Sequence, residues 1–252
     1  VAGILVVNEL IQHVELPYKG YSTPEVFVEV VPGDSTQVIA ERLLTNGVVR
    51  DDFSFRFAVW RSGNERGLQA GEYLFNQPLS AMQVVDKIAA GKVHLRSITF
   101  PEGHTIAEMA NIFEDGAFGS HAAFIEAARR VELIKDLDKQ ATTLEGYLFP
   151  ETYALPRDAT AEDLVQAMVM QFRGVFDDGL QDLAEDRGMS VRDVVTLASI
   201  IQKEASADTE HELVSAVYNN RLRIGMPLQC DPTVIYALVL DGLYDGNLTR
   251  ES

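Results

Sequence analysis

Short apolar segments alternate with helical patterns through the first hundred residues. Val26, Phe27 and Val28 open a run of β-branched and aromatic residues that is typical of a strand. Ser35 is a favourable N-cap ahead of apolar residues at helical spacing, and Asn46-Gly47 would end that helix. In chain order, the pattern predicts a strand at 26–31, helices at 36–45 and from residue 51 or 52, a strand at 71–75, and a helix that follows Ser80 and stops at Gly91.

A similar pattern returns about 70 residues later, with a strand at 98–100 and helices that carry residues 106–113 and 124–125. Matching positions in the two copies are Gly33, Ala40, Gly47 and Phe55 in the first, and Gly103, Ala110, Gly116 and Phe124 in the second. The sequence therefore contains a weak repeat of a strand–turn–helix–helix unit. Two copies are too few for a solenoid.

The chain changes character at Thr142. Residues 144–153 form a dense aromatic and carboxylate segment bounded by prolines, and the remainder is predicted to be helical. The expected helices span 160–176, 179–187, 190–206, 209–223 and 231–241, the last beginning with Asp231 as N-cap and Pro232 at the first helical position. The predicted fold class is α+β, a small strand-and-helix module followed by a mainly helical domain.

Composition narrows the function classes. The chain has 252 residues, of which 46% are hydrophobic, enough for one large or two modest domains. Its formal net charge is −17, and no basic stripe offsets it, so nucleic-acid binding is excluded. Cys230 is the one cysteine, which rules out an intrachain disulfide, and the five histidines are scattered, so no metal site is predicted.

Candidate chemistry lies on the predicted helix 190–206. Its expected apolar stripe comprises Val194, Leu197, Ala198, Ile201 and Ala205. At about 100° per residue, Gln202 and Glu204 fall on opposite flanks of this stripe, where a buried face could meet a cleft. A carboxyl group at such an edge is partly desolvated and could act as a general acid, whereas an amide has no proton to give. Taken alone, the pattern is more typical of an ordinary helix border than of a catalytic edge.

The next predicted helix places polar residues in line with its expected apolar face. Leu213, Ala216 and Val217 set that face, and the same spacing continues to Asn220 and Arg221. Inward polar groups need partners. They either tie down neighbouring carbonyls or a carboxylate, or orient a polar ligand. The candidate partners of Arg221 are Glu145, Glu204 and Asp231.

Three blocks carry a family resemblance. They are 144–150 (LEGYLFP), 197–204 (LASIIQKE) and 220–236 (NRLRIGMPLQCDPTVIY). Together, and in this order, they resemble the MltG/YceG-like family of bacterial endolytic murein transglycosylases, and the resemblance covers nearly the whole chain. It implies cleavage of peptidoglycan strands between N-acetylmuramic acid and N-acetylglucosamine, leaving 1,6-anhydromuramic acid ends and terminating nascent glycans. No cofactor is implied.

The resemblance also implies site residues. The family's single catalytic acid maps to Gln202, where this sequence departs from the pattern. We hypothesise an engineered glutamate-to-glutamine change that inactivates the chain, the alternative being a natural pseudoenzyme that binds glycan without cutting it, or an envelope scaffold. The substrate-binding residues implied by the blocks are Glu145, Tyr147, Glu204, Asn220, Arg221, Gln229 and Asp231.

Domain organisation and surroundings follow from the same resemblance. It implies a membrane-proximal segment and linker at 1–24, a LysM-like module at 25–95, and a catalytic domain at 96–252 that contains a second LysM-like unit and is C-terminally incomplete. The expected location is the bacterial inner membrane, through a single-pass anchor. Residues 1–7 are expected to be either the tail of that anchor or a short packing segment. The expected partners are peptidoglycan glycan strands and peptidoglycan synthases (penicillin-binding proteins).

Overall fold

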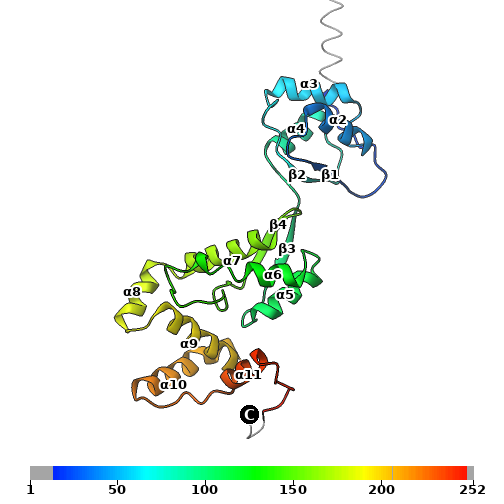
Figure 1. Cartoon of the computed structure of the whole chain (residues 1–252). Helices are drawn as coiled ribbons and strands as arrows, with labels where there is room; N and C mark the ends of the chain where they lie inside the picture. The colour runs from blue at the N-terminus through cyan, green and yellow to red at the C-terminus, as the bar shows by residue number, and fades with distance from the viewer. Residues whose placement is uncertain (1–13, 206, 249–252) are drawn as a thin grey trace, which may run out of the picture. The chain divides into compact units, whose positions relative to one another are not determined.

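The computed structural model describes residues 14–205 and 207–248 (Figure 1). The chain divides into two compact units. Unit 1 comprises residues 1–97 and 154–159, and unit 2 comprises residues 98–153 and 160–252. The chain thus leaves unit 1, returns to it briefly, and leaves again. The crossings fall in strands β3 (Leu95–Thr99) and β4 (Thr152–Pro156), which pair with each other.

Unit 1 is built on an antiparallel strand pair, β1 (Val26–Val30) and β2 (Gly71–Phe75), with Val28 opposite Tyr73. Helices α2 (Thr36–Thr45), α3 (Asp52–Ser62) and α4 (Ala81–Ala89) complete it. The predicted caps of these helices are confirmed, because Ser35, Asp51 and Ser80 each accept a main-chain N–H through the side chain. The buried core includes Val28, Ile39, Leu43, Phe55, Val59, Tyr73, Phe75, Val84 and Ile88.

Unit 2 is mainly helical. Its elements are α5 (Ile106–Asp115), α6 (His121–Ala127), the 3-10 helix η1 (Val131–Leu133), α7 (Ala161–Val175), α8 (Asp178–Asp186), α9 (Val191–Glu204), the 3-10 helix η2 (Asp208–Glu210), α10 (His211–Arg223) and α11 (Asp231–Leu240). Phe100, Phe113 and Phe124 meet in its aromatic core, with ring centroids 5.4–6.0 Å apart. A smaller cluster joins α9, α10 and the start of α11 through Leu197, Ile200, Tyr218 and Cys230.

The mixed helix-and-strand class is confirmed, but several details differ from expectation. Strand β4 was not predicted. On α9 the buried residues are Leu197 and Ile200, whereas Ala198 is exposed, so the apolar stripe lies about one position from where it was expected. Asp231 is the first residue of α11 and not its N-cap, a place taken by Cys230 without a side-chain cap bond.

The expected inward face of α10 is wrong. Leu213 is 69% exposed and Val217 is 42% exposed, whereas Tyr218 is buried. The helix buries little, and Tyr218 is its buried residue, packed in the cluster with Leu197, Ile200 and Cys230. Asn220 is consequently exposed.

The predicted single-pass membrane anchor is also wrong for the part of the chain that the structure describes. No helix there is long and apolar enough to cross a membrane. Residues 1–7, which were expected to be the tail of that anchor or a short packing segment, lie outside the described residues.

Candidate active site

Gln202 lies in the last turn of α9, half-buried, beside the turn that precedes α5. The turn brings Gly103 so close that a Cβ added there would lie 3.3 Å from Gln202 Cγ and 3.8 Å from Lys203 Cε. Gly103 has a φ of +74°, a left-handed conformation that glycine adopts at no steric cost. Glycine is therefore favoured at this position for two reasons, its backbone angle and the close approach of the Gln202 side chain on α9.

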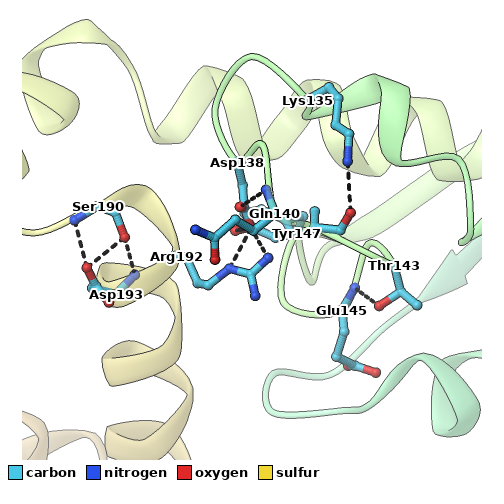
Figure 2. Close-up of polar contacts among 10 residues, drawn as sticks. Lys135, Asp138, Gln140, Thr143, Glu145, Tyr147, Ser190, Arg192 and Asp193 are labelled. Atoms are coloured by element: carbon cyan, nitrogen blue, oxygen red, sulfur yellow. Dashed lines mark hydrogen bonds and ion pairs between the residues drawn. The ribbon is translucent and has the colours of Figure 1, made fainter.

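The start of α9 is fixed by a reciprocal capping box between Ser190 and Asp193. Ser190 N donates to Asp193 Oδ2 at 2.9 Å, and Asp193 N donates back to Ser190 Oγ at 3.2 Å (Figure 2). These bonds satisfy main-chain groups that a helix end otherwise leaves without partners. The hydrogen bonds that Asp193 accepts from the side chain and then from the main chain of Ser190 hold the Asp193 pKa below its ordinary value. The helix that carries Gln202 thus has a defined beginning and a defined neighbour at its end.

Glu145 joins three separate parts of unit 2. Its carboxylate accepts the main-chain N–H of Ile106, at 3.2 Å and 3.3 Å to its two oxygens, and so sits at the N-terminus of α5. Tyr236 on α11 donates its hydroxyl to the same carboxylate. Glu145 therefore ties the 144–148 segment, the first turn of α5 and α11 together. Its partner Ile106 lies three residues along the chain from Gly103.

Two carboxyl groups near this turn have pKa values shifted in opposite directions. Burial raises the pKa of Glu145, and the nearby negative charge of Glu108 adds to the effect. Burial would also raise the pKa of Glu108, but hydrogen bonds from Thr105 and the positive charge of Lys203 outweigh it and lower that pKa. Burial, followed by the charge of Glu145, raises the pKa of Tyr236 to about 12. Such a split is typical of sites that handle protons.

Tyr147 does not face a groove. Its hydroxyl is buried and donates to Asp138 Oδ2 at 2.7 Å, and Arg192 Nε donates to the same oxygen at 2.9 Å (Figure 2). Asp138 itself is 6% exposed. Burial and this hydrogen bond raise the pKa of Tyr147 above its ordinary value. The network attaches the first turn of α9 to the 138–147 segment, so the contacts of Tyr147 are those of a structural residue.

Arg221 takes the simpler of the two roles expected for it. Its guanidinium donates to the main-chain carbonyl of Leu228 and lies 5.9 Å from the centroid of the Tyr218 ring. The arginine thus fastens the loop between α10 and α11, by a contact with a carbonyl and not with a carboxylate. Glu204 is exposed on α9. The pKa of Tyr218 is raised mainly by the burial of its hydroxyl and further by the negative charge of Glu204.

Gln229 and Asp231 line an open groove of about 460 Å³ at the start of α11, together with Leu228, Cys230, Thr233 and Val234. Gln229 has a φ of +50°, an unusual conformation for a residue with a side chain. Backbone strain of this kind is concentrated at functional sites. The groove falls in the size range of small-molecule sites, which bury sugars and similar ligands.

The structure therefore brings some predicted residues together and leaves others apart. Gln202 and Glu145 adjoin the same turn before α5, and Gln229 and Asp231 share a groove. Tyr147 lies in a buried network, and Asn220 is exposed. Two contributors were missed as site residues, Gly103 and Tyr236. The repeat marked Gly103 as a turn glycine, but nothing local in the sequence indicates which helix faces it.

The fold and this arrangement define a two-unit α+β protein with a polar site between helix ends. A model of the YceG-like family matches residues 28–252. The chain is 29% identical over 237 residues to the endolytic murein transglycosylase of Bacillus subtilis (strain 168), covering 88% of this chain and 65% of that protein. It is 26% identical over 255 residues to the endolytic murein transglycosylase of Streptococcus pneumoniae (strain D39), covering 88% and 45%.

A solved structure agrees with these relatives. The 2.6 Å crystal structure of a putative yceG-like protein from Listeria monocytogenes has a TM-score of 0.55 and 28% identity, covering 91% of this chain and 80% of that one. The chain belongs to the YceG-like family, as the three sequence blocks predicted. It spans about half to two thirds of the length of the curated relatives that it matches.

Proposed function

We propose that this chain is an endolytic peptidoglycan transglycosylase whose catalytic acid position, residue 202, is occupied by glutamine. The single observation that carries the proposal is that two relatives at 26–29% identity, aligned over 88% of this chain, are endolytic murein transglycosylases. The placement of Gln202 supports the assignment, because the residue is half-buried at a helix end and packed against Gly103.

The proposed reaction needs one carboxyl group. A glutamic acid at position 202 protonates the glycosidic oxygen that leaves C1 of N-acetylmuramic acid, and the resulting carboxylate then takes the proton of the C6 hydroxyl of the same sugar. The C6 oxygen bonds to C1, which closes the 1,6-anhydro ring and restores the acid. Most glycosidases use two carboxyl groups, one on each side of the sugar. The amide of Gln202 supplies no proton, so this chain is proposed to bind glycan without cutting it.

Other residues have supporting roles in this proposal. Glu145 holds the turn that faces residue 202, since it binds the N–H of Ile106 and the hydroxyl of Tyr236. Gln229 and Asp231 contact the sugar chain along their groove. We propose further that residues 25–95 form a LysM-like glycan-binding module, consistent with the strand–helix–helix–strand order of β1, α2, α3 and β2.

The test is to restore the acid. Purified peptidoglycan is digested with the Gln202→Glu chain and with the unchanged chain, and the fragments are analysed by mass spectrometry. Anhydro-ended fragments are expected from the restored chain only. A matched control adds Glu185→Gln to the restored chain, because Glu185 is an exposed carboxyl group on α8. Activity should survive there; its loss would show that cleavage does not depend on position 202 in particular.

A binding protein without catalysis is the second candidate, favoured by Gln202 itself. If the Gln202→Glu chain pulls down glycan strands as well as the unchanged chain does but yields no anhydro ends, the binding role replaces the enzymatic one. We propose in addition that residues 25–95 bind peptidoglycan synthases. Deletion of residues 25–95 from the Gln202→Glu chain should then abolish capture of the synthases while the chain still cuts glycan.

A further inference from the structure

Unit 1 has a hollow of its own, distant in sequence from the residues discussed above. It has a volume of about 380 Å³ and lies along α4 and the chain on either side of that helix. Its walls are formed by Gln77, Leu79, Gln83, Asp86, Lys87 and Lys92. Two lysines in the lining of one small hollow are unexpected in a chain with a net charge of −17.

Lys87 is the more constrained of the two lysines. It is half-buried, and its Nζ donates to the main-chain carbonyl of Leu74 and lies 5.0 Å from the centroid of the Phe75 ring. Burial, and then the positive charge of Lys92, lower the Lys87 pKa. Among the residues that the structure describes, no carboxylate forms an ion pair with either lysine. The ammonium is therefore held in place with part of its charge uncompensated.

A main-chain hydrogen bond links the backbone of the second lysine to that of the first. Lys92 N donates to the carbonyl of Lys87 at 3.1 Å, just beyond the end of α4. Lys92 itself is exposed and belongs to the wall of the hollow. An anion bound between the two ammonium groups would relieve their mutual repulsion and pair the half-buried charge, so an anion is the ligand that gains most here.

The other walls narrow the class of anion. Asp86 adds a carboxylate to the wall, and this group would repel a multiply charged phosphate. It can, however, accept a hydrogen bond from an N–H group of a ligand that carries a single carboxylate. Gln83 Oε1 accepts the N–H of Ser80 at 2.9 Å in the capping box, which orients the side chain and leaves its amide nitrogen able to donate. A carboxylate next to an amide N–H is the chemistry of a peptide.

We propose that this hollow binds a carboxylate of a short peptide, and, resting on the proposed function, that the peptide is the stem peptide carried by peptidoglycan. Unit 1 would then recognise the peptide branch of a strand whose sugar backbone is recognised elsewhere. Strands with intact, unamidated stem peptides would be retained in preference to bare glycan.

The experiment uses the whole chain with Gln202, so that cleavage cannot interfere. Isothermal titration calorimetry compares a muropeptide with free stem-peptide carboxylates, the same muropeptide fully amidated, and inorganic phosphate. We expect amidation to weaken binding at least tenfold and phosphate not to compete. Equal binding of the free and amidated forms, or displacement by phosphate at the same concentration, overturns the proposal.

Two variants locate the binding site. Lys92→Glu changes an exposed residue, so the fold should be retained, and we expect a loss of tenfold or more in affinity for the free-carboxylate muropeptide. Lys139→Glu is the matched control, since Lys139 is exposed, carries the same charge change and belongs to unit 2. Equal losses of affinity in both variants would show that the effect comes from the net charge of the protein, and would refute the proposed binding site.

This outcome is separable from that of the enzyme proposal. Anhydro ends from the Gln202→Glu chain together with no preference for free carboxylates would refute the hollow alone. A clear preference together with no cleavage would refute the transglycosylase assignment and leave the peptide site standing.

Discussion

Gly33 and Gly103 occupy the same turn in the two copies of the repeat, and replacing each by alanine separates backbone strain from positioning. Both have positive φ, +91° and +74°. An alanine in the left-handed region costs about 1–2 kcal/mol. A change of 1 kcal/mol shifts the Tm by about 4–8 °C in a unit the size of unit 1 and by about 2–4 °C in the larger unit 2. In differential scanning calorimetry, Gly33→Ala should therefore lower the Tm of unit 1 by about 4–16 °C, and Gly103→Ala that of unit 2 by about 2–8 °C.

Only one of the two substitutions should affect the site. A Cβ at Gly33 meets nothing within 4 Å, whereas a Cβ at Gly103 lies 3.3 Å from Gln202 Cγ. That contact is tight enough for the side chain at 202 to move by about 0.3 Å. If a misplacement of 1 Å costs about 100-fold in rate, 0.3 Å costs about fourfold.

The assay measures anhydro-end formation in the Gln202→Glu chain with either Gly103→Ala or Gly33→Ala added. We expect the Gly103 variant to be about fourfold slower than the Gly33 variant at saturating peptidoglycan, with similar glycan binding. Equal rates, within about a factor of two, would refute the idea that this turn positions residue 202. Loss of binding in the Gly103 variant alone would assign the turn to substrate binding.

Two further predictions concern stability and its dependence on pH. Burial raises the folded-state pKa of Glu145, so folding disfavours its charged form. Glu145→Gln should therefore raise the Tm of unit 2 at pH 7. This gain should vanish below the ordinary pKa of 4.5, because the carboxyl group is then protonated in both the folded and the unfolded state. A gain independent of pH would contradict burial as the cause. Asp138 behaves oppositely, because hydrogen bonds from Tyr147 and Arg192 outweigh its burial and lower its pKa. Asp138→Asn should lower the free energy of unfolding, measured in urea at pH 7, by about 2 kcal/mol, which is less than for a fully buried ion pair because Arg192 is 45% exposed. The difference between the two proteins should shrink as the pH falls through the lowered pKa of Asp138. An undiminished difference in acid would show that the variant loses packing and not a charge interaction.

Local chemistry in the sequence predicted the helices well. Ser35, Asp51, Ser80 and Ser190 each cap the helix expected to follow, because a cap is a bond between residues two or three apart. Strand β4 escaped prediction because it ends at Pro156 and pairs with β3, more than fifty residues earlier. No local pattern marks such a partner.

The candidate site was predictable only in part, for the same reason. The family blocks marked Gln202, Glu145, Gln229 and Asp231 as candidates. They could not indicate that Gly103 faces α9, since that contact joins segments a hundred residues apart. The apolar face of α10 was misplaced because most of the helix is exposed. The spacing of its apolar residues therefore does not indicate which side is buried.

The short return of the chain to unit 1 limits how freely this module could be moved between proteins. Residues 154–159 belong to unit 1, and there Arg157 donates to the carboxylate of Glu72, whose side chain is only 7% exposed. A fragment that ends at residue 95 keeps both strands of the β1–β2 pair but leaves that buried carboxylate without its arginine. A recombination event that moved residues 25–95 as one contiguous block would therefore leave Glu72 unpaired. The segment 154–159, which carries Arg157, would have to be moved as well.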